Sequence, residues 1–153
     1  MEEPANLDAW RAAYDIAADL CDGAQAARCA LKVVALYASL GERKLAATLI
    51  SDALGRVGGE LPIDFYFAAA GQAERAGDIE TALLAYRRLT SDHPADPAAA
   101  MAYFKTGQVL RRLDAAADAC WAFEQVTAHP ACTQELREAA GRALVGLNAG
   151  TRV

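Results

Sequence analysis

An all-α protein is the fold class that the sequence predicts, on three observations. Hydrophobic residues make up 54% of the 153 residues and aromatic residues only 7%, and much of the apolar content is alanine, the strongest helix former. β-branched residues occur singly or in pairs, so no run alternates with the period of two that a half-buried strand requires. Glycine, proline and capping residues divide the chain into amphipathic segments, which predicts about eight helices.

Helix starts are marked by residues that cap or open a helix. Asn6 and Thr133 are candidate N-caps of the first and last helices, because their side chains can accept a hydrogen bond from a free backbone N–H. Pro62 lies at the entry to the fourth helix, and Asp96-Pro97 opens the sixth. The expected helices cover about residues 7–20, 24–40, 43–55, 63–76, 79–91, 97–112, 114–128 and 133–147.

Helix ends are marked by glycine and proline. Asp22-Gly23 ends the first expected helix, Gly41 the second and Gly77 the fourth. His93-Pro94 and His129-Pro130 end the fifth and the seventh. The turns between helices are short, about two to six residues, so helices that follow each other in sequence are expected to pack as antiparallel neighbours.

A spacing of 36 residues recurs along these helices. The turn Gly41-Glu42 recurs as Gly77-Asp78, and Gly71-Gln72 recurs as Gly107-Gln108. His93-Pro94 recurs as His129-Pro130 at the same spacing. Several matches at one period indicate an internal repeat whose unit is a helix pair.

The best of these pairs, residues 65–97, resembles a tetratricopeptide repeat. An aromatic residue opens its first helix, small residues follow where the two helices touch, Gly77-Asp78 makes the turn, and a proline closes the unit. The residues that carry the resemblance are Tyr66, Ala69, Ala70, Gly77, Ala82, Tyr86, Leu89 and Pro94, repeated in the next pair by Tyr103, Gly107, Ala119, Phe123 and Pro130. The pair from about 27 to 59 is weaker, with Gly58 where proline would stand.

The resemblance implies a single domain over residues 1–153, a right-handed superhelix of antiparallel helix pairs (a tetratricopeptide-like α-solenoid) of about eight helices. Residues 24–61 would form a degenerate repeat, and 62–97 and 98–130 the two better ones. Residues 5–23 and 131–150 would be the capping helices that such arrays need for solubility.

The resemblance also implies a binding face, because the first helix of each pair lines the concave groove that takes a peptide or a partner helix. On that face six basic residues stand against two acidic ones, Asp64 and Glu74, although the chain has a net charge of −5. An acidic protein or peptide partner is therefore the expected ligand. The alternative is that these cations serve solubility alone. The candidate partner-binding residues are Arg28, Lys32, Phe67, Gly71, Arg75, Met101, Phe104, Lys105, Gln108, Arg111 and Arg112.

Neither catalysis nor cofactor binding is predicted. His93 and His129 both precede prolines in turns, which indicates structural roles, and neither has a nucleophile and an orienting acid at motif spacing. The four cysteines match no zinc or redox motif, which leaves a Cys120/His129/Cys132 grouping as the remaining metal alternative.

Three further expectations concern the setting of the protein. The acidic chain is not expected to bind nucleic acid, and the absence of a long apolar segment predicts a cytoplasmic protein without membrane insertion. Alanine and arginine richness suggests a GC-rich bacterial genome. Two functional alternatives stay open: self-assembly through an exposed face such as Trp10/Tyr14, which would give a homo-oligomer, and a regulatory domain of a larger enzyme or membrane protein.

Overall fold

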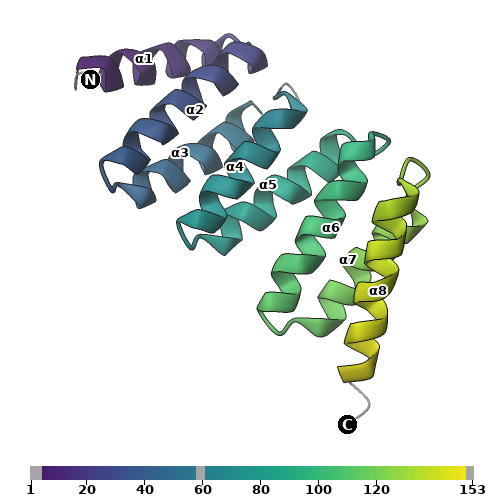
Figure 1. The fold of residues 1–153 in the computed structure, drawn as a ribbon. Coiled ribbons are helices and arrows are strands. Elements are labelled where there is room, and N and C mark those ends of the chain that lie inside the picture. The colour runs from purple at the N-terminus through teal and green to yellow at the C-terminus, as the bar shows by residue number, and fades with distance from the viewer. Residues whose placement is uncertain (1–4, 58–60, 151–153) are drawn as a thin grey trace. The chain divides into compact units, whose positions relative to one another are not determined.

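The computed structural model describes residues 5–57 and 61–150, and over these residues it is all-helical, with no strand (Figure 1). This confirms the predicted fold class, and each expected helix lies within three residues of an observed one at either end. The eight helices of the described residues are α1 (Ala5–Asp19), α2 (Gly23–Ser39), α3 (Arg43–Arg56), α4 (Ile63–Arg75), α5 (Ile79–Asp92), α6 (Pro97–Arg112), α7 (Ala116–Ala128) and α8 (Gln134–Gly150).

The chain divides into two compact units, Met1–Arg88 and Leu89–Val153. In the first unit α1 packs against α2, and α2 packs against α3. In the second unit α6 packs against α7, and α7 packs against α8. Helices that follow each other in sequence are therefore neighbours in space within each unit, as the short turns predict.

Four turns between helices share one backbone conformation, with a residue in the left-handed region. Cys21, Gly41, Gly77 and Asp114 have φ values of 54°, 76°, 76° and 58°. At each of them the next residue donates its N–H to a carbonyl five residues earlier, as in Asp78 N to Ala73 O at 2.9 Å, which satisfies the free carbonyls at the helix end. The two glycines that define the repeat spacing are confirmed as turn residues, because glycine adopts this conformation without steric cost.

Three of the sequence-based boundary assignments are wrong. Asp22 does not end α1: its carboxylate accepts a hydrogen bond from Gln25 N at 3.1 Å and so caps the start of α2. Asp114 does not open α7: it occupies the left-handed turn position, and α7 begins at Ala116. Asn6 lies inside α1, which begins at Ala5, so it is not the N-cap. Residue type alone did not distinguish a turn position from a cap, since aspartate and asparagine favour both.

The other predicted helix starts are confirmed. Pro62 is the N-cap of α4, and Pro97 is the first residue of α6. The carboxylate of Asp96 accepts the N–H of Ala98 at 2.8 Å, and the hydroxyl of Thr133 accepts the N–H of Leu136 at 3.2 Å. Each bond satisfies one of the backbone donors that a helix start leaves free.

A charged cluster joins α1 to α3 inside the first unit. The guanidinium of Arg56 donates to Asp15 at 3.0 Å, to Asp19 at 2.6 Å and to Asp52 at 3.2 Å. The hydroxyl of Tyr14, which is fully buried, donates to Asp52 at 2.7 Å. Arg56 also lies over the Tyr14 ring, with its central carbon 5.6 Å from the ring centroid. This cluster holds the first helix on the third.

Tyr14→Phe is expected to lower the free energy of unfolding by about 1 to 2 kcal/mol near neutral pH, because Asp52 loses a charge-assisted hydrogen bond. Burial and the bond to Asp52 raise the pKa of Tyr14 above its ordinary value of 10.0. Above pH 10 the unfolded chain therefore loses this proton before the folded chain does, and the stabilisation declines as the pH rises. Urea unfolding of wild type and Tyr14→Phe near neutral pH and above pH 10 tests this. The difference in the free energy of unfolding between the two proteins should shrink above pH 10, and a constant difference would contradict the stabilising role of the Tyr14–Asp52 hydrogen bond.

The buried face of α1 bears on the self-assembly alternative. Tyr14 is fully buried and its hydroxyl bonds Asp52 of α3, so this side chain is not available to a second chain, whereas Trp10 is half-buried. The large apolar side chains that α1 exposes are instead Ile16 and Leu20.

None of the helices within residues 5–57 and 61–150 combines the length and the apolar character that crossing a bilayer requires.

Candidate functional site

In the first unit, the predicted face consists of residues on α2 and α4. Arg28 and Lys32 are exposed on α2, and Arg75 is exposed near the end of α4. Phe67 is half-buried, and its ring packs against Tyr86 with centroids 6.3 Å apart. A methyl group added at Gly71 would lie 3.8 Å from an Arg75 nitrogen, so the Arg75 guanidinium lies next to this glycine on the surface of α4. The helices thus place Arg28, Lys32 and Arg75 at the surface of the unit.

In the second unit, the predicted residues all lie on α6. Met101, Lys105, Arg111 and Arg112 are exposed, and Gln108 is half-buried. A single helix therefore brings the cationic and amide groups to one surface.

Phe104 differs from the other predicted residues of α6. Its ring packs edge to face against Phe123, with centroids 5.6 Å apart, next to the core cluster that Phe123 forms with Ala119, Val126 and Ala140. Phe104 therefore packs mainly on the core beneath the predicted face, and only the part of its ring that stays exposed could contact a partner.

The cations of this face differ from Arg56 in their ionic partners. Arg56 is surrounded by three carboxylates, which raise the pKa of its guanidinium further above its ordinary value. Within the part of the chain that the structure describes, no carboxylate pairs with five of the exposed predicted cations. These cations are Arg28, Lys32, Arg75, Lys105 and Arg111. An acidic protein that leaves these charges unpaired has positive charge available for an anionic ligand.

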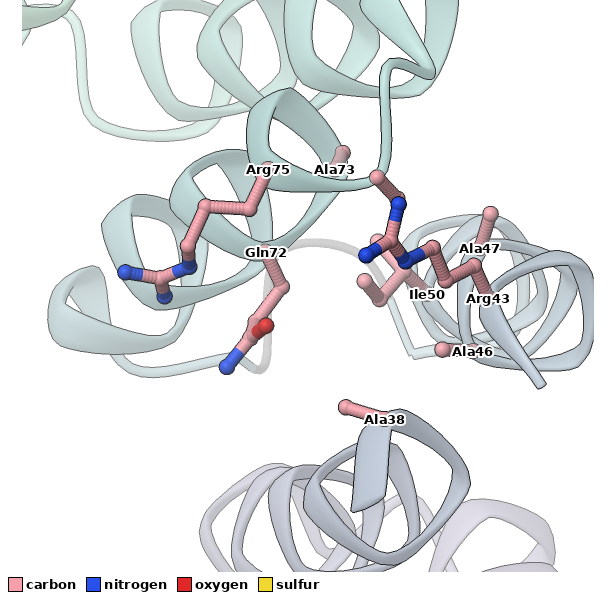
Figure 2. A pocket seen from close by; sticks show the side chains of 9 residues that line it. Ala38, Arg43, Ala46, Ala47, Ile50, Gln72, Ala73 and Arg75 are labelled. Atoms are coloured by element: carbon pink, nitrogen blue, oxygen red, sulfur yellow. The ribbon is translucent and has the colours of Figure 1, made fainter. Parts of the chain in front are cut away.

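One pocket of the first unit adjoins Arg75. It has a volume of about 180 Å³ and lies among the end of α2, the first half of α3 and the second half of α4. Figure 2 shows Arg43 and Gln72 on opposite sides of the opening, Ala38 facing them from α2, and the Arg75 guanidinium beyond Gln72. The rest of the wall is apolar and is made of Ala46, Ala47, Ile50, Ala73 and Ala76.

The pocket holds polar donors on an apolar wall. Arg43, like Arg75, is exposed and has no ion pair with any residue that the structure describes. The nearest acidic neighbours in sequence are Glu42, exposed at the N-cap of α3, and Glu74, which accepts a 2.8 Å hydrogen bond from the Tyr86 hydroxyl. The N-terminus of α3 favours an anion and the C-terminus of α4 disfavours it, so these two contributions oppose each other. The guanidinium and amide side chains therefore set the preference for an anion.

Sequence reasoning found Arg75 and missed Arg43 and Gln72. Arg43 is the first residue of α3, the second helix of its pair, and the predicted face included first helices only. Gln72 lies 36 residues before Gln108, which was placed on the predicted face. The repeat spacing could therefore have placed Gln72 on that face too. Contact between α2, α3 and α4 brings these residues to one pocket.

Another polar groove of the first unit lies between α3 and the start of α5. It is lined by Lys44, Thr48, Ser51, Asp52, Asp78 and Thr81. Both carboxylates already have partners, since Asp52 accepts from Tyr14 and Asp78 accepts from the backbone and hydroxyl of Thr81 at 3.1 and 2.8 Å. The groups of this groove mainly cap α5 and join α3 to α1.

His129 and Cys29 have structural surroundings. His129 is 7% exposed; its Nε2 lies 2.8 Å from the Pro94 carbonyl, and its Nδ1 accepts the N–H of Ala131 at 3.1 Å. Burial raises the pKa of the Cys29 thiol, which keeps it protonated and unreactive. Among the residues of the described ranges, no group of three histidine, cysteine or acidic residues could hold a metal ion, the Cys120/His129/Cys132 grouping included.

No protein-family model matches the chain, and comparison with curated proteins finds no significant similarity.

Proposed function

We propose that this chain is a non-catalytic protein-interaction module whose helix pairs form a tetratricopeptide-like superhelix, and that it binds an acidic segment of a partner protein. The faces involved are those of α2 and α4 in the first unit and of α6 in the second. The observation that carries the proposal is the set of five exposed cations without ionic partners on these helices, in a chain of net charge −5.

The chemistry of the exposed groups supports this choice of ligand. Arginine guanidinium groups bind carboxylates through paired hydrogen bonds, and lysine adds a compact positive charge. Met101 and the half-buried Phe67 add apolar area next to these charges, which suits side chains of a peptide rather than a small inorganic ion. Binding is therefore expected to weaken as the salt concentration rises.

The experiment is affinity capture from lysate of the source cells, comparing wild type with the triple variant Arg75→Glu/Lys105→Glu/Arg111→Glu. We expect the partner to be lost or its affinity to fall by about tenfold or more, which corresponds to about 1.4 kcal/mol. The bound partner should be released as the ionic strength is raised above about 0.15 M.

The matched control is Lys44→Glu/Arg137→Glu/Arg142→Glu, which changes the net charge equally at three exposed cations outside the predicted face. This control should retain the partner. Retention of full binding by the first triple variant, or equal loss in both variants, would overturn the proposed binding face.

A further inference from the structure

The pocket beside Arg75 has a shape and a chemistry that restrict what can enter it. Its volume of about 180 Å³ is in the range of one amino-acid side chain, well below that of a folded element or a drug-sized ligand. Alanine residues and Ile50 form most of its wall, so the body of the occupant must be apolar. Arg43 and Gln72 stand at the opening, so its end must accept hydrogen bonds and carry negative charge (Figure 2).

A glutamate side chain meets these requirements. Its two methylene groups can lie on the alanine wall while its planar carboxylate accepts two N–H groups from the fork of Arg43 and one from the amide of Gln72. A phosphoryl group is larger, carries close to two charges and has three acceptor oxygens, so it would need both arginines that line the pocket. The Arg75 guanidinium is directed away from Arg43, beyond Gln72 (Figure 2), which leaves one guanidinium and one amide for the group that enters.

We propose that this pocket receives the side chain of one glutamate from the partner segment, with Arg43 and Gln72 binding its carboxylate. Arg75 also lines the pocket, but its guanidinium lies on the far side of Gln72, where it binds a second acidic group of the same segment (Figure 2). The inference deepens the proposed function and rests on it, because it names the chemical group of the partner segment that enters a pocket beside the predicted face of the first unit.

The test uses the full chain labelled with ¹⁵N and short blocked peptides as probes. The first probe is acetyl-Ala-Ala-Glu-Ala-Ala-amide, and its neutral counterpart carries glutamine in place of glutamate. Two further probes distinguish other anions: one has phosphoserine at the central position, and the other has glutamine there with a free C-terminal carboxylate. We expect the glutamate probe to shift the side-chain signals of Arg43 and Gln72 and to bind about tenfold more tightly than the other three.

Two variants separate pocket entry from general attraction. Arg43→Gln should weaken binding of the glutamate probe about tenfold, whereas Lys44→Gln, which removes the same charge one residue away and outside the pocket, should change it less than about twofold. Ala38→Leu narrows the pocket without changing its charge, so it should weaken binding of the glutamate probe. The substitution should leave the fold intact, because Ala38 is exposed on α2 and leucine is a good helix former. Unchanged backbone chemical shifts elsewhere confirm folding.

The outcomes distinguish this inference from the proposed function. If partner capture depends on the basic face but Arg43→Gln and Ala38→Leu bind the glutamate probe as Lys44→Gln does, the pocket assignment is wrong and the proposed function stands. Tighter binding of the phosphoserine or free-carboxylate probe would overturn the choice of glutamate. If the triple charge reversal retains the partner, the proposed function is wrong, and the pocket inference that rests on it is wrong as well.

Discussion

Gly107→Ala is expected to lower the free energy of unfolding of the second unit by about 1 to 3 kcal/mol. A methyl group at this position would lie 2.8 to 2.9 Å from three ring atoms of Phe123. The ring cannot move away cheaply, because Phe123 is fully buried and packs against Phe104. The helix propensity that alanine gains over glycine, about 1 kcal/mol, offsets only part of this cost.

The matched control for this prediction is Gly71→Ala, at the equivalent position of the preceding repeat. Among the described residues, a methyl group there would have one neighbour within 4 Å, an Arg75 nitrogen at the ordinary contact distance of 3.8 Å. Alanine should therefore stabilise the first unit by about 0.5 to 1 kcal/mol. Urea unfolding followed by circular dichroism measures both. Gly107→Ala should cost less stability in a Phe123→Leu background than in the wild type, because the smaller leucine side chain leaves room for the methyl group. Equal effects of alanine at Gly71 and Gly107 would contradict the close packing of α6 on α7.

His129→Ala is expected to destabilise the second unit by about 2 to 4 kcal/mol, because it removes two hydrogen bonds and leaves a carbonyl and an N–H without their partner. The imidazole joins the turn before α6 to the turn after α7: Nε2 donates to the Pro94 carbonyl at 2.8 Å, while Nδ1 accepts from Ala131 at 3.1 Å. Because the carbonyl can only accept and the amide can only donate, the bound form is the neutral tautomer with the proton on Nε2.

Two substitutions divide the contributions of the two nitrogens. His129→Asn retains a short acceptor for the Ala131 N–H but cannot reach Pro94, and His129→Gln retains the reach toward Pro94 with an amide donor. Each should therefore recover part of the stability that His129→Ala loses. Unfolding can be followed by Trp121 fluorescence in a Trp10→Phe background, since these are the only two tryptophans and Trp121 lies in the second unit. Unchanged stability of His129→Ala would contradict the structural role of this histidine.

The turn residues illustrate how far sequence reasoning extended. Gly41 and Gly77 were predictable as turns because only glycine enters the left-handed region at little cost, and their spacing revealed the repeat. Cys21 and Asp114 occupy the same conformation without being glycine. Cysteine gives no signal for such a turn, and aspartate is equally typical of a helix cap. Trp121 shows a similar limit: its position among the apolar residues of its helix is compatible with burial, yet its side chain is 53% exposed and packs edge to face on Tyr103.

The amino-acid sequence by itself determined the fold class, the eight helices and the positions of most caps, because these depend on local propensity, periodicity and turn chemistry within a few residues. Tertiary packing decided which of two equivalent glycines, Gly71 or Gly107, is in contact with a ring. It also decided that Arg56 is surrounded by carboxylates while Arg43 stands unpaired at a pocket. These properties depend on which side chains from other helices come within a few ångströms, and spacing along one helix carries no information about that distance.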